Sequence, residues 1–268
     1  MSICAAFMVP HPPLIVPAVG RGGEEQIKKT TESYNRVADE IAALVPDTIV
    51  ISSPHTTMYY DYFHISPGEG ATGSFARFGA PEVNFSEKYD TELVSEITRL
   101  ASSAGLSAGT EGARDPKLDH GTMVPLYFIR QKYKAGRIVR VGLSGLSYKD
   151  HYRLGQLIKE ASDHLGRKTV YVASGDLSHK LQTYGPYGFA KEGTEYDRRI
   201  MDVCGRGAFP ELFDFSEEFC DKAAECGHRS FIIMAGALDG TPVKATAYSH
   251  EDVTGVGYGI CSFFPAGS

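Results

Sequence analysis

The sequence lacks the features that would place it in a membrane or on nucleic acid. No apolar run approaches the roughly 20 residues that a helix needs to span a bilayer. The formal net charge is -6, whereas a nucleic-acid or anionic-lipid partner favours a basic face. The apolar N-terminus has no basic segment and is interrupted by Pro10, Pro12 and Pro13, unlike a signal peptide. We therefore expect a cytoplasmic protein with neither a nucleic-acid nor a membrane partner.

Paired cysteines and several common catalytic motifs are also missing. The five cysteines include no CxxC pair, and their odd number argues against a disulfide framework, so reduced thiols are expected. No GxxxxGK[ST], HExxH or GxSxG motif is present, which disfavours a P-loop NTPase, a zincin and an α/β-hydrolase. Any catalytic or binding site in this chain is therefore expected to combine residues from distant segments.

The hydrophobic pattern predicts strands that alternate with helices. Strands are expected at residues 3–9, 48–52, 60–66, 137–144, 169–174, 243–249 and 256–264. Helices are expected at residues 24–45, 89–104, 121–133 and 149–165, with more between about 190 and 240. This order predicts an α/β fold, with helices on both faces of a central mixed, largely parallel sheet. No composition break marks a linker, so residues 1–268 are expected to form one domain.

One segment, residues 67–86, is rich in Gly, Pro, Ser and Phe and predicts a long loop. Its Gly68–Gly73 stretch matches GxGxxG formally. A dinucleotide-binding fingerprint needs a strand before it and a helix opening within it, and neither is expected here. Long loops in compact domains are often functional, so the segment is a candidate wall for a binding site.

Four histidines stand at the ends of predicted elements. His11, His55 and His179 each come shortly after a strand, and His120 comes just before a helix. Ligands collect at the carboxyl edge of an open α/β sheet, and imidazole both binds metals and transfers protons near neutral pH. The pattern predicts a metal site with an acid/base group attached. Histidines without such a context are taken as surface or structural residues: His64, His151, His164 and His250.

Prolines stiffen the chain next to two of these histidines. Pro10 precedes His11 and Pro54 precedes His55. Each proline fixes its own φ angle and restricts the residue before it. Such a backbone suits a side chain that must be held accurately against a ligand.

Acidic residues accompany the other two histidines. Asp176 lies three residues before His179, where it would cap a helical turn and orient the imidazole if a turn begins there. Asp119 directly precedes His120, and its charge would raise the pKa of that imidazole.

A third metal ligand is expected to be anionic, because two neutral imidazoles do not offset the charge of a dication. Glu225 and Cys226 are adjacent candidates. Two histidines and a carboxylate are typical of non-haem Fe(II) oxygenases, whereas a thiolate favours softer metals. The ordinary alternatives are a solvated helix residue for Glu225 and a small buried apolar residue for Cys226. The spacing of these residues in the sequence does not decide between the metal-ligand roles and the ordinary alternatives.

Short segments spread over nearly the whole chain resemble the catalytic B-type (LigB-like) subunit of class III extradiol ring-cleavage dioxygenases. They also resemble the Memo proteins, which share that fold. The matching segments, in the order of the family, are Val9-Pro10-His11-Pro12-Pro13, Ser53-Pro54-His55, Asp119-His120-Gly121 with Val124-Pro125-Leu126, Gly175-Asp176-Leu177-Ser178-His179, Glu225-Cys226-Gly227 and Gly255-Val256-Gly257-Tyr258.

The resemblance implies roles for the histidines. His11 and His55 would be Fe(II) ligands, with a carboxylate from the Glu225 region as the third. His179 would be the catalytic acid/base, and His120 would contact substrate or oxygen. Asp176 is the third expected catalytic residue, because it lies three residues before His179 and would orient that imidazole.

The departure from the family pattern lies at the third ligand. Ring-cleaving members have Glu there, whereas Memo-like members have Cys followed by Gly, as in Cys226-Gly227. The leading hypothesis is an Fe(II)-dependent extradiol dioxygenase that opens a catechol or aminophenol with O₂. His179 would then serve as general base and acid, and Phe75, Phe78 and Phe85 would wall the small aromatic substrate.

Two alternatives remain on the same scaffold. One is a Memo-like metal-binding or redox protein without ring cleavage, for which zinc or copper is also acceptable. The other is a zinc-type hydrolase. A homo-oligomer or a small partner subunit is compatible with each of them.

Overall fold

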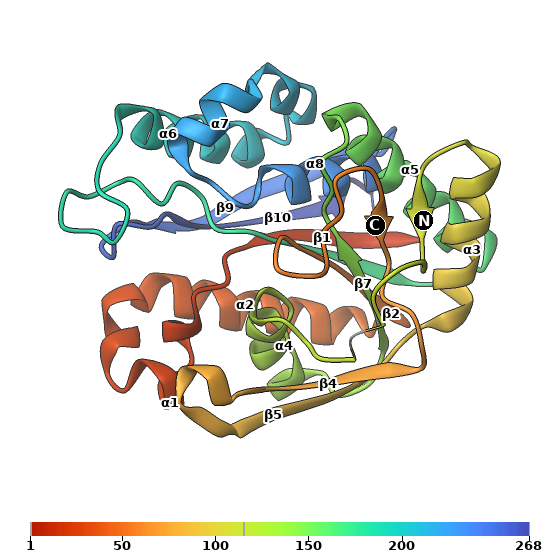
Figure 1. Ribbon diagram of the computed structural model, residues 1–268, viewed down its shortest axis with the longest axis horizontal. Helices are drawn as coiled ribbons and strands as arrows, with labels where there is room; N and C mark the ends of the chain where they lie inside the picture. The colour runs from red at the N-terminus through yellow and green to blue at the C-terminus, as the bar shows by residue number, and fades with distance from the viewer. Residues whose placement is uncertain (1, 115, 268) are drawn as a thin grey trace.

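The computed structural model describes residues 2–114 and 116–267, and within them a six-stranded sheet forms the centre of an α/β fold (Figure 1). The strands are β1 (Ile3–Val9), β2 (Thr48–Ser53), β3 (Phe63–His64), β4 (Gly70–Phe75), β5 (Ala80–Lys88), β6 (Ala108–Gly109), β7 (Arg137–Gly142), β8 (Thr169–Ser174), β9 (Val243–Glu251) and β10 (Tyr258–Pro265). The order in the main sheet is β7-β2-β8-β1-β10-β9. The pairs among β7, β2, β8 and β1 are parallel, and β10 and β9 add antiparallel pairs.

Helices cover both faces of this sheet, as the alternating pattern predicts (Figure 1). The α-helices are α1 (Pro17–Gly20), α2 (Lys28–Leu44), α3 (Thr91–Ser103), α4 (His120–Lys132), α5 (Tyr148–His164), α6 (Lys191–Arg206), α7 (Glu217–Ala223) and α8 (His228–Ala237). Short 3-10 helices lie at Pro13–Ile15, Gly23–Ile27, Ala76–Phe78 and Phe209–Asp214. Helices α2 and α4 pack on one face, and α3, α5, α6 and α8 on the other. Among the described helices, none is long and apolar enough to cross a membrane.

The central strands are apolar because they are buried on both faces. Every residue of β2 and β8 is buried, so their side chains point alternately into the two helical layers. Ile49 and Ile51 face the layer of α2 and α4, whereas Val50 faces the opposite layer. This double burial explains why uninterrupted apolar runs, rather than an alternating pattern, predicted these strands correctly.

The prediction of a long loop at residues 67–86 was wrong. Strands β4 and β5 pair there as an antiparallel hairpin, on the α4 side of the sheet (Figure 1). Val83, Phe85 and Glu87 are less exposed than their immediate neighbours, which is the two-residue period of a half-buried strand. The high content of Gly, Pro and Ser masked that period. The strand expected at 60–66 shrinks to β3, which pairs with the short β6.

Strand order determines where the site residues lie. Because β2, β8 and β1 are adjacent and parallel, their carboxyl ends meet at one edge of the sheet. Val9 pairs with Ser174, and Ser52 pairs with Ala173. The segments that follow these three strands, which carry most of the expected site residues, therefore emerge side by side.

Candidate metal centre and adjoining cavity

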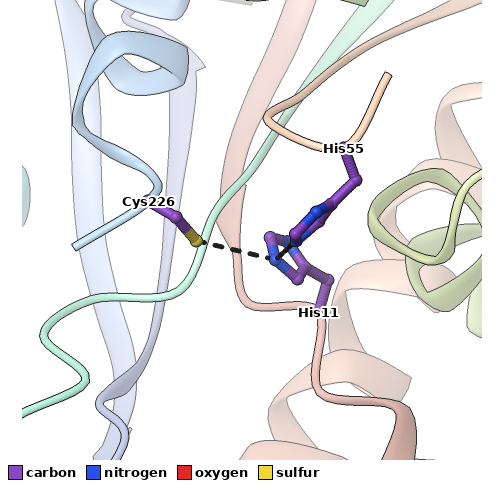
Figure 2. A group of neighbouring side chains, drawn as sticks. All are labelled: His11, His55 and Cys226. Carbon is purple, nitrogen blue, oxygen red and sulfur yellow. Dashed lines mark hydrogen bonds between the residues drawn. The ribbon is translucent and has the colours of Figure 1, made fainter. Parts of the chain in front are cut away.

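Three donor atoms from distant parts of the chain converge at this edge of the sheet. Nε2 of His11 lies 3.1 Å from Nε2 of His55 and 3.6 Å from Sγ of Cys226. Figure 2 shows the three side chains pointing toward one another from three separate segments. His11 is buried, Cys226 is half-buried and His55 is exposed. All three potential ligand atoms lie within 4.8 Å of one another.

The tautomer of His11 follows from its hydrogen bonds. Its Nδ1 lies 3.0 Å from Oγ of Ser174, and that hydroxyl lies 2.6 Å from the carbonyl of Gly121. A carbonyl can only accept, so the Ser174 hydroxyl donates to Gly121 and accepts from Nδ1–H of His11. Burial lowers the pKa of His11 to about 3, which keeps the ring neutral. The lone pair of Nε2 is therefore directed at His55 and Cys226.

The distances between these atoms match those around a single tetrahedral ion. Two nitrogens at about 2.05 Å and a sulfur at about 2.3 Å from one ion lie about 3.3 Å and about 3.6 Å from each other. The structure gives 3.1 Å for the nitrogen pair and 3.6 Å for nitrogen to sulfur. Two imidazoles and a thiolate also form a donor set that zinc, copper and iron accept. The residues present therefore fit a transition metal ion.

A close approach of two backbones positions Cys226. A Cβ atom on Gly175 would lie 2.1 Å from Cα of Gly227, so only glycine allows these segments to touch. At this contact the amide of Asp176 donates to Sγ of Cys226 at 3.3 Å, and the amide of Cys226 donates to the carbonyl of Asp176 at 3.3 Å. The thiol is thereby held beside His11.

Glu225 lies outside the group of three donors. Its carboxylate accepts a hydrogen bond from the amide of His228, the first residue of α8. The unpaired amides at a helix N-terminus favour a negative charge, which explains why this acidic residue turns toward α8. Burial nevertheless raises the pKa of Glu225 to about 7. Of the two adjacent candidates for the third ligand, the structure brings only Cys226 to His11 and His55.

Asp176 does not cap a helical turn, because residues 175–179 are not helical. Its Oδ1 instead accepts a hydrogen bond from the amide of His11 at 2.7 Å. Burial raises the pKa of this carboxyl group. Asp176 thus fastens the segment after β1 to the segment after β8, and its other oxygen lies 3.9 Å from Nε2 of His11.

His179 also lies near Cys226. Asp176, His179 and Cys226 form a second group whose ligand atoms lie within 4.8 Å of one another. Nδ1 of His179 hydrogen-bonds to the carbonyl of Ala224, which can only accept. In the neutral ring, Nε2 is consequently the free acceptor, as a general base requires.

His120 begins α4 and lies against His55, with 3.9 Å between their ring centroids. Asp119 raises the pKa of His120, as expected, but other influences outweigh it. Burial and the neighbouring His55 and His11 lower it to about 4, and the carboxylate offsets this only in part. The carboxylate of Asp119 has other partners: it caps α4 and forms an ion pair with Arg140 at 3.1 Å.

A cavity of about 960 Å³ opens beside the histidines and is lined by both His55 and His120. Phe78 and Phe85 from the β4–β5 hairpin form part of its wall, whereas Phe75 is fully buried behind it. The ring of Phe78 lies 5.5 Å from that of His120. Three further lining residues were not expected from the sequence, because they come from separate elements that only the fold brings together: His64 on β3, Arg77 on the hairpin and Arg140 on β7.

Comparisons with known proteins agree with this architecture. A profile of the family described as "Catalytic LigB subunit of aromatic ring-opening dioxygenase" matches residues 5–261. Protein CA_C1420 of Clostridium acetobutylicum is 38% identical, over 97% of this chain and 57% of that protein. The 2-aminophenol 1,6-dioxygenase beta subunit of a Pseudomonas species is 25% identical, over 97% of this chain and 93% of that protein. MEMO1 family protein TK1477 of Thermococcus kodakarensis is 29% identical, over 73% of this chain and 67% of that protein.

The fold recurs in a solved structure. The crystal structure of uncharacterized protein JW3007 from Escherichia coli K12 superposes with a TM-score of 0.65 at 15% identity, over 97% of this chain and 99% of that one. The chain spans little more than half of the Clostridium relative, at 57% of its length. The profile match over nearly all residues shows that the chain belongs to the family of catalytic LigB subunits of aromatic ring-opening dioxygenases.

Proposed function

We propose that this chain is a Memo-like metalloprotein that holds a transition metal ion through Nε2 of His11, Nε2 of His55 and Sγ of Cys226. The observation that carries the proposal is the convergence of these three atoms at distances that suit one ion. The position of Glu225, which is bound to the N-terminus of α8, supports the thiolate as the third ligand. The similarity to a MEMO1 family protein supports the same assignment.

Other side chains around the three ligands would orient a ligand, move a proton or contact a bound molecule. A metal ion bound there would supply Lewis acidity and, where it is iron or copper, a redox couple. Ser174 fixes the tautomer and orientation of His11 through Nδ1. His179, whose Nε2 is free to accept, is the group placed to move a proton. His120 lies against His55 and lines the cavity, where it would contact a bound ligand.

Replacing His179 tests whether it is a proton carrier or a ligand. We expect His179→Ala to leave the dissociation constant for Co²⁺ unchanged, because the ligand atoms of His11, His55 and Cys226 remain in place. A titration followed by cobalt absorption measures this constant. The matched variant His55→Ala should bind Co²⁺ much more weakly. Weak binding in His179→Ala together with normal binding in His55→Ala would place the ion in the group of Asp176, His179 and Cys226 instead.

Ring opening of a catechol or aminophenol with Fe(II) and O₂ is the second candidate function. It is favoured by the cavity, which places aromatic walls beside His55 and His120. A relative is named as the beta subunit of 2-aminophenol 1,6-dioxygenase, which also makes a partner subunit plausible for this chain. The thiol of Cys226, where that chemistry expects a carboxylate, is the reason it ranks second.

Oxygen consumption separates the two candidates. The protein is reconstituted with Fe(II) without oxygen, mixed with a panel of catechols and aminophenols, and then exposed to air. The Memo-like function predicts binding of iron but no oxygen uptake beyond that of a Cys226→Ser control. Stoichiometric uptake with a yellow, ring-opened product would establish the dioxygenase and overturn the first proposal.

A further inference from the structure

A buried carboxylate outside the candidate metal centre holds the segment that carries His179. Asp197 lies on α6, and its side chain is only 4% exposed. Its Oδ1 accepts a hydrogen bond at 2.8 Å from the amide of Ser178, the residue directly before His179. A carboxylate at this depth is costly unless both of its oxygens find partners.

His250 on β9 is the partner of the other oxygen. It is a histidine without a functional context in the sequence, but its Nε2 lies 2.6 Å from Oδ2 of Asp197. The imidazole side chain is 32% exposed, so it can exchange protons with water although the carboxylate is buried. A Cβ atom on Gly257 would lie 1.9 Å from Oδ2 of Asp197, so a glycine is required beside this pair.

Ser178 is bonded through its backbone and its side chain. Its hydroxyl donates to the carbonyl of Ala223 at 2.7 Å, and its carbonyl accepts from the amide of Gly257 at 2.8 Å. The amide and Nδ1 of His179, the next residue, both hydrogen-bond to the carbonyl of Ala224. The position of Ser178 therefore governs the direction of the adjacent imidazole.

The charge of the pair depends on the proton of His250. The charged groups that act on this imidazole most strongly are acidic and come from α6, from β9 and from the segment after it: Asp197, Glu251 and Asp252. On the neighbouring elements, β10 places Gly259 opposite it, and Thr30 of α2 binds Glu251. Burial lowers the pKa of His250, but the hydrogen bond and the charge of Asp197 outweigh burial and raise it overall.

We propose that Asp197 and His250 are positioning residues, which hold the imidazole of His179 in place for proton transfer. The protonated ring of His250 keeps the buried carboxylate charged and bonded to the amide of Ser178. Because the pKa of His250 is raised, this hold is present below that pKa and is lost as the pH rises through it. The inference rests on the proposed function, because that function makes His179 the proton carrier.

Nuclear magnetic resonance of the full chain without metal tests the inference at two atoms. Protection of the Ser178 amide from hydrogen exchange, relative to an unstructured chain, reports its bond to Asp197. The nitrogen signals of the neutral His179 ring report its tautomer. In His250→Ala, below the pKa of the wild-type His250, we expect Ser178 to exchange about 10-fold or more faster. We also expect His179 to lose its single tautomer, with the proton on Nδ1.

Two further variants separate a specific role from a general loss of stability. His250→Gln retains a neutral donor for Asp197 and should restore most of the protection of Ser178, without its dependence on pH. His164→Ala removes a similar pair, in which the imidazole lies 2.9 Å from the carboxylate of Glu96 on α3. This control should change neither signal.

Asp197→Asn tests the pair from the other side. Asparagine keeps an oxygen for the amide of Ser178 but carries no charge, so the loss of protection with rising pH should disappear. Unchanged protection of Ser178 and an unchanged tautomer of His179 in His250→Ala would overturn the inference. An equal loss of protection throughout the main sheet would also overturn it, because the pair would then support the fold in general.

A parallel measurement of Zn²⁺ binding keeps the inference separate from the proposed function. A wild-type chain that binds no Zn²⁺ refutes the proposed metal centre. The responses of Ser178 and His179 in the metal-free chain decide independently whether Asp197 and His250 position them.

Discussion

Replacing Cys226 by serine is expected to weaken metal binding by more than about 100-fold. Loss of a mere hydrogen-bond partner of a ligand typically costs about 10–100-fold, and here a ligand atom itself is removed. A serine hydroxyl stays protonated and cannot offset the charge of a dication as a thiolate does. Competition with a chromophoric chelator measures the affinity for Zn²⁺ in the wild type and in the variant.

Glu225→Gln is the matched control for this substitution, one residue away. Glutamine keeps an oxygen that can accept from the amide of His228, but it has no negative charge to offer a metal. We expect its affinity for Zn²⁺ to equal that of the wild type. The opposite pair of results, with weak binding in Glu225→Gln and normal binding in Cys226→Ser, would make the carboxylate the third ligand and favour the ring-opening function.

Ser174→Ala should weaken metal binding by about 10–100-fold although Ser174 touches no ion. Its hydroxyl accepts from Nδ1 of His11 and donates to the carbonyl of Gly121, which leaves the lone pair of Nε2 facing His55. Without that hydroxyl the imidazole can rotate or adopt the other tautomer. The same competition experiment measures the change.

Ser162→Ala provides the control for the general cost of removing a buried hydroxyl. Ser162 lies on α5, is fully buried, and donates to the carbonyl of Ile158 at 2.9 Å. Both variants should lose some thermal stability, because each leaves a buried partner unsatisfied. Only Ser174→Ala should lose metal affinity. Equal affinity losses in the two variants would show that the hydroxyl of Ser174 has no specific role at His11.

The sequence predicted the main sheet well, because its strands are either continuously buried or flanked by clear breaks. The ranges of β1 and β8 agree with the predicted ranges at both ends. The hairpin at β4 and β5 escaped prediction, because glycine, proline and serine are used there within strands. Gly70 illustrates the reason: a Cβ atom on it would lie 2.2 Å from the carbonyl of Glu87, so the close pairing itself requires glycine.

For the candidate site, strand order mattered more than any motif. A histidine after each of several parallel strands indicates convergence only if those strands are neighbours, and β2, β8 and β1 are neighbours here. The choice between Glu225 and Cys226 could not be made from the sequence, because it depends on which side chain the N-terminus of α8 attracts. The arginines that line the cavity were equally hidden, because Arg77 and Arg140 lie far apart in the chain.

X-ray absorption at the zinc edge of the metal-loaded wild-type chain tests the central claim most directly, because it reports the ligand atoms themselves. A centre formed by His11, His55 and Cys226 predicts one sulfur neighbour at about 2.3 Å and imidazole nitrogens at about 2.0–2.1 Å. A coordination shell that contains only nitrogen and oxygen, with no sulfur, would contradict the account.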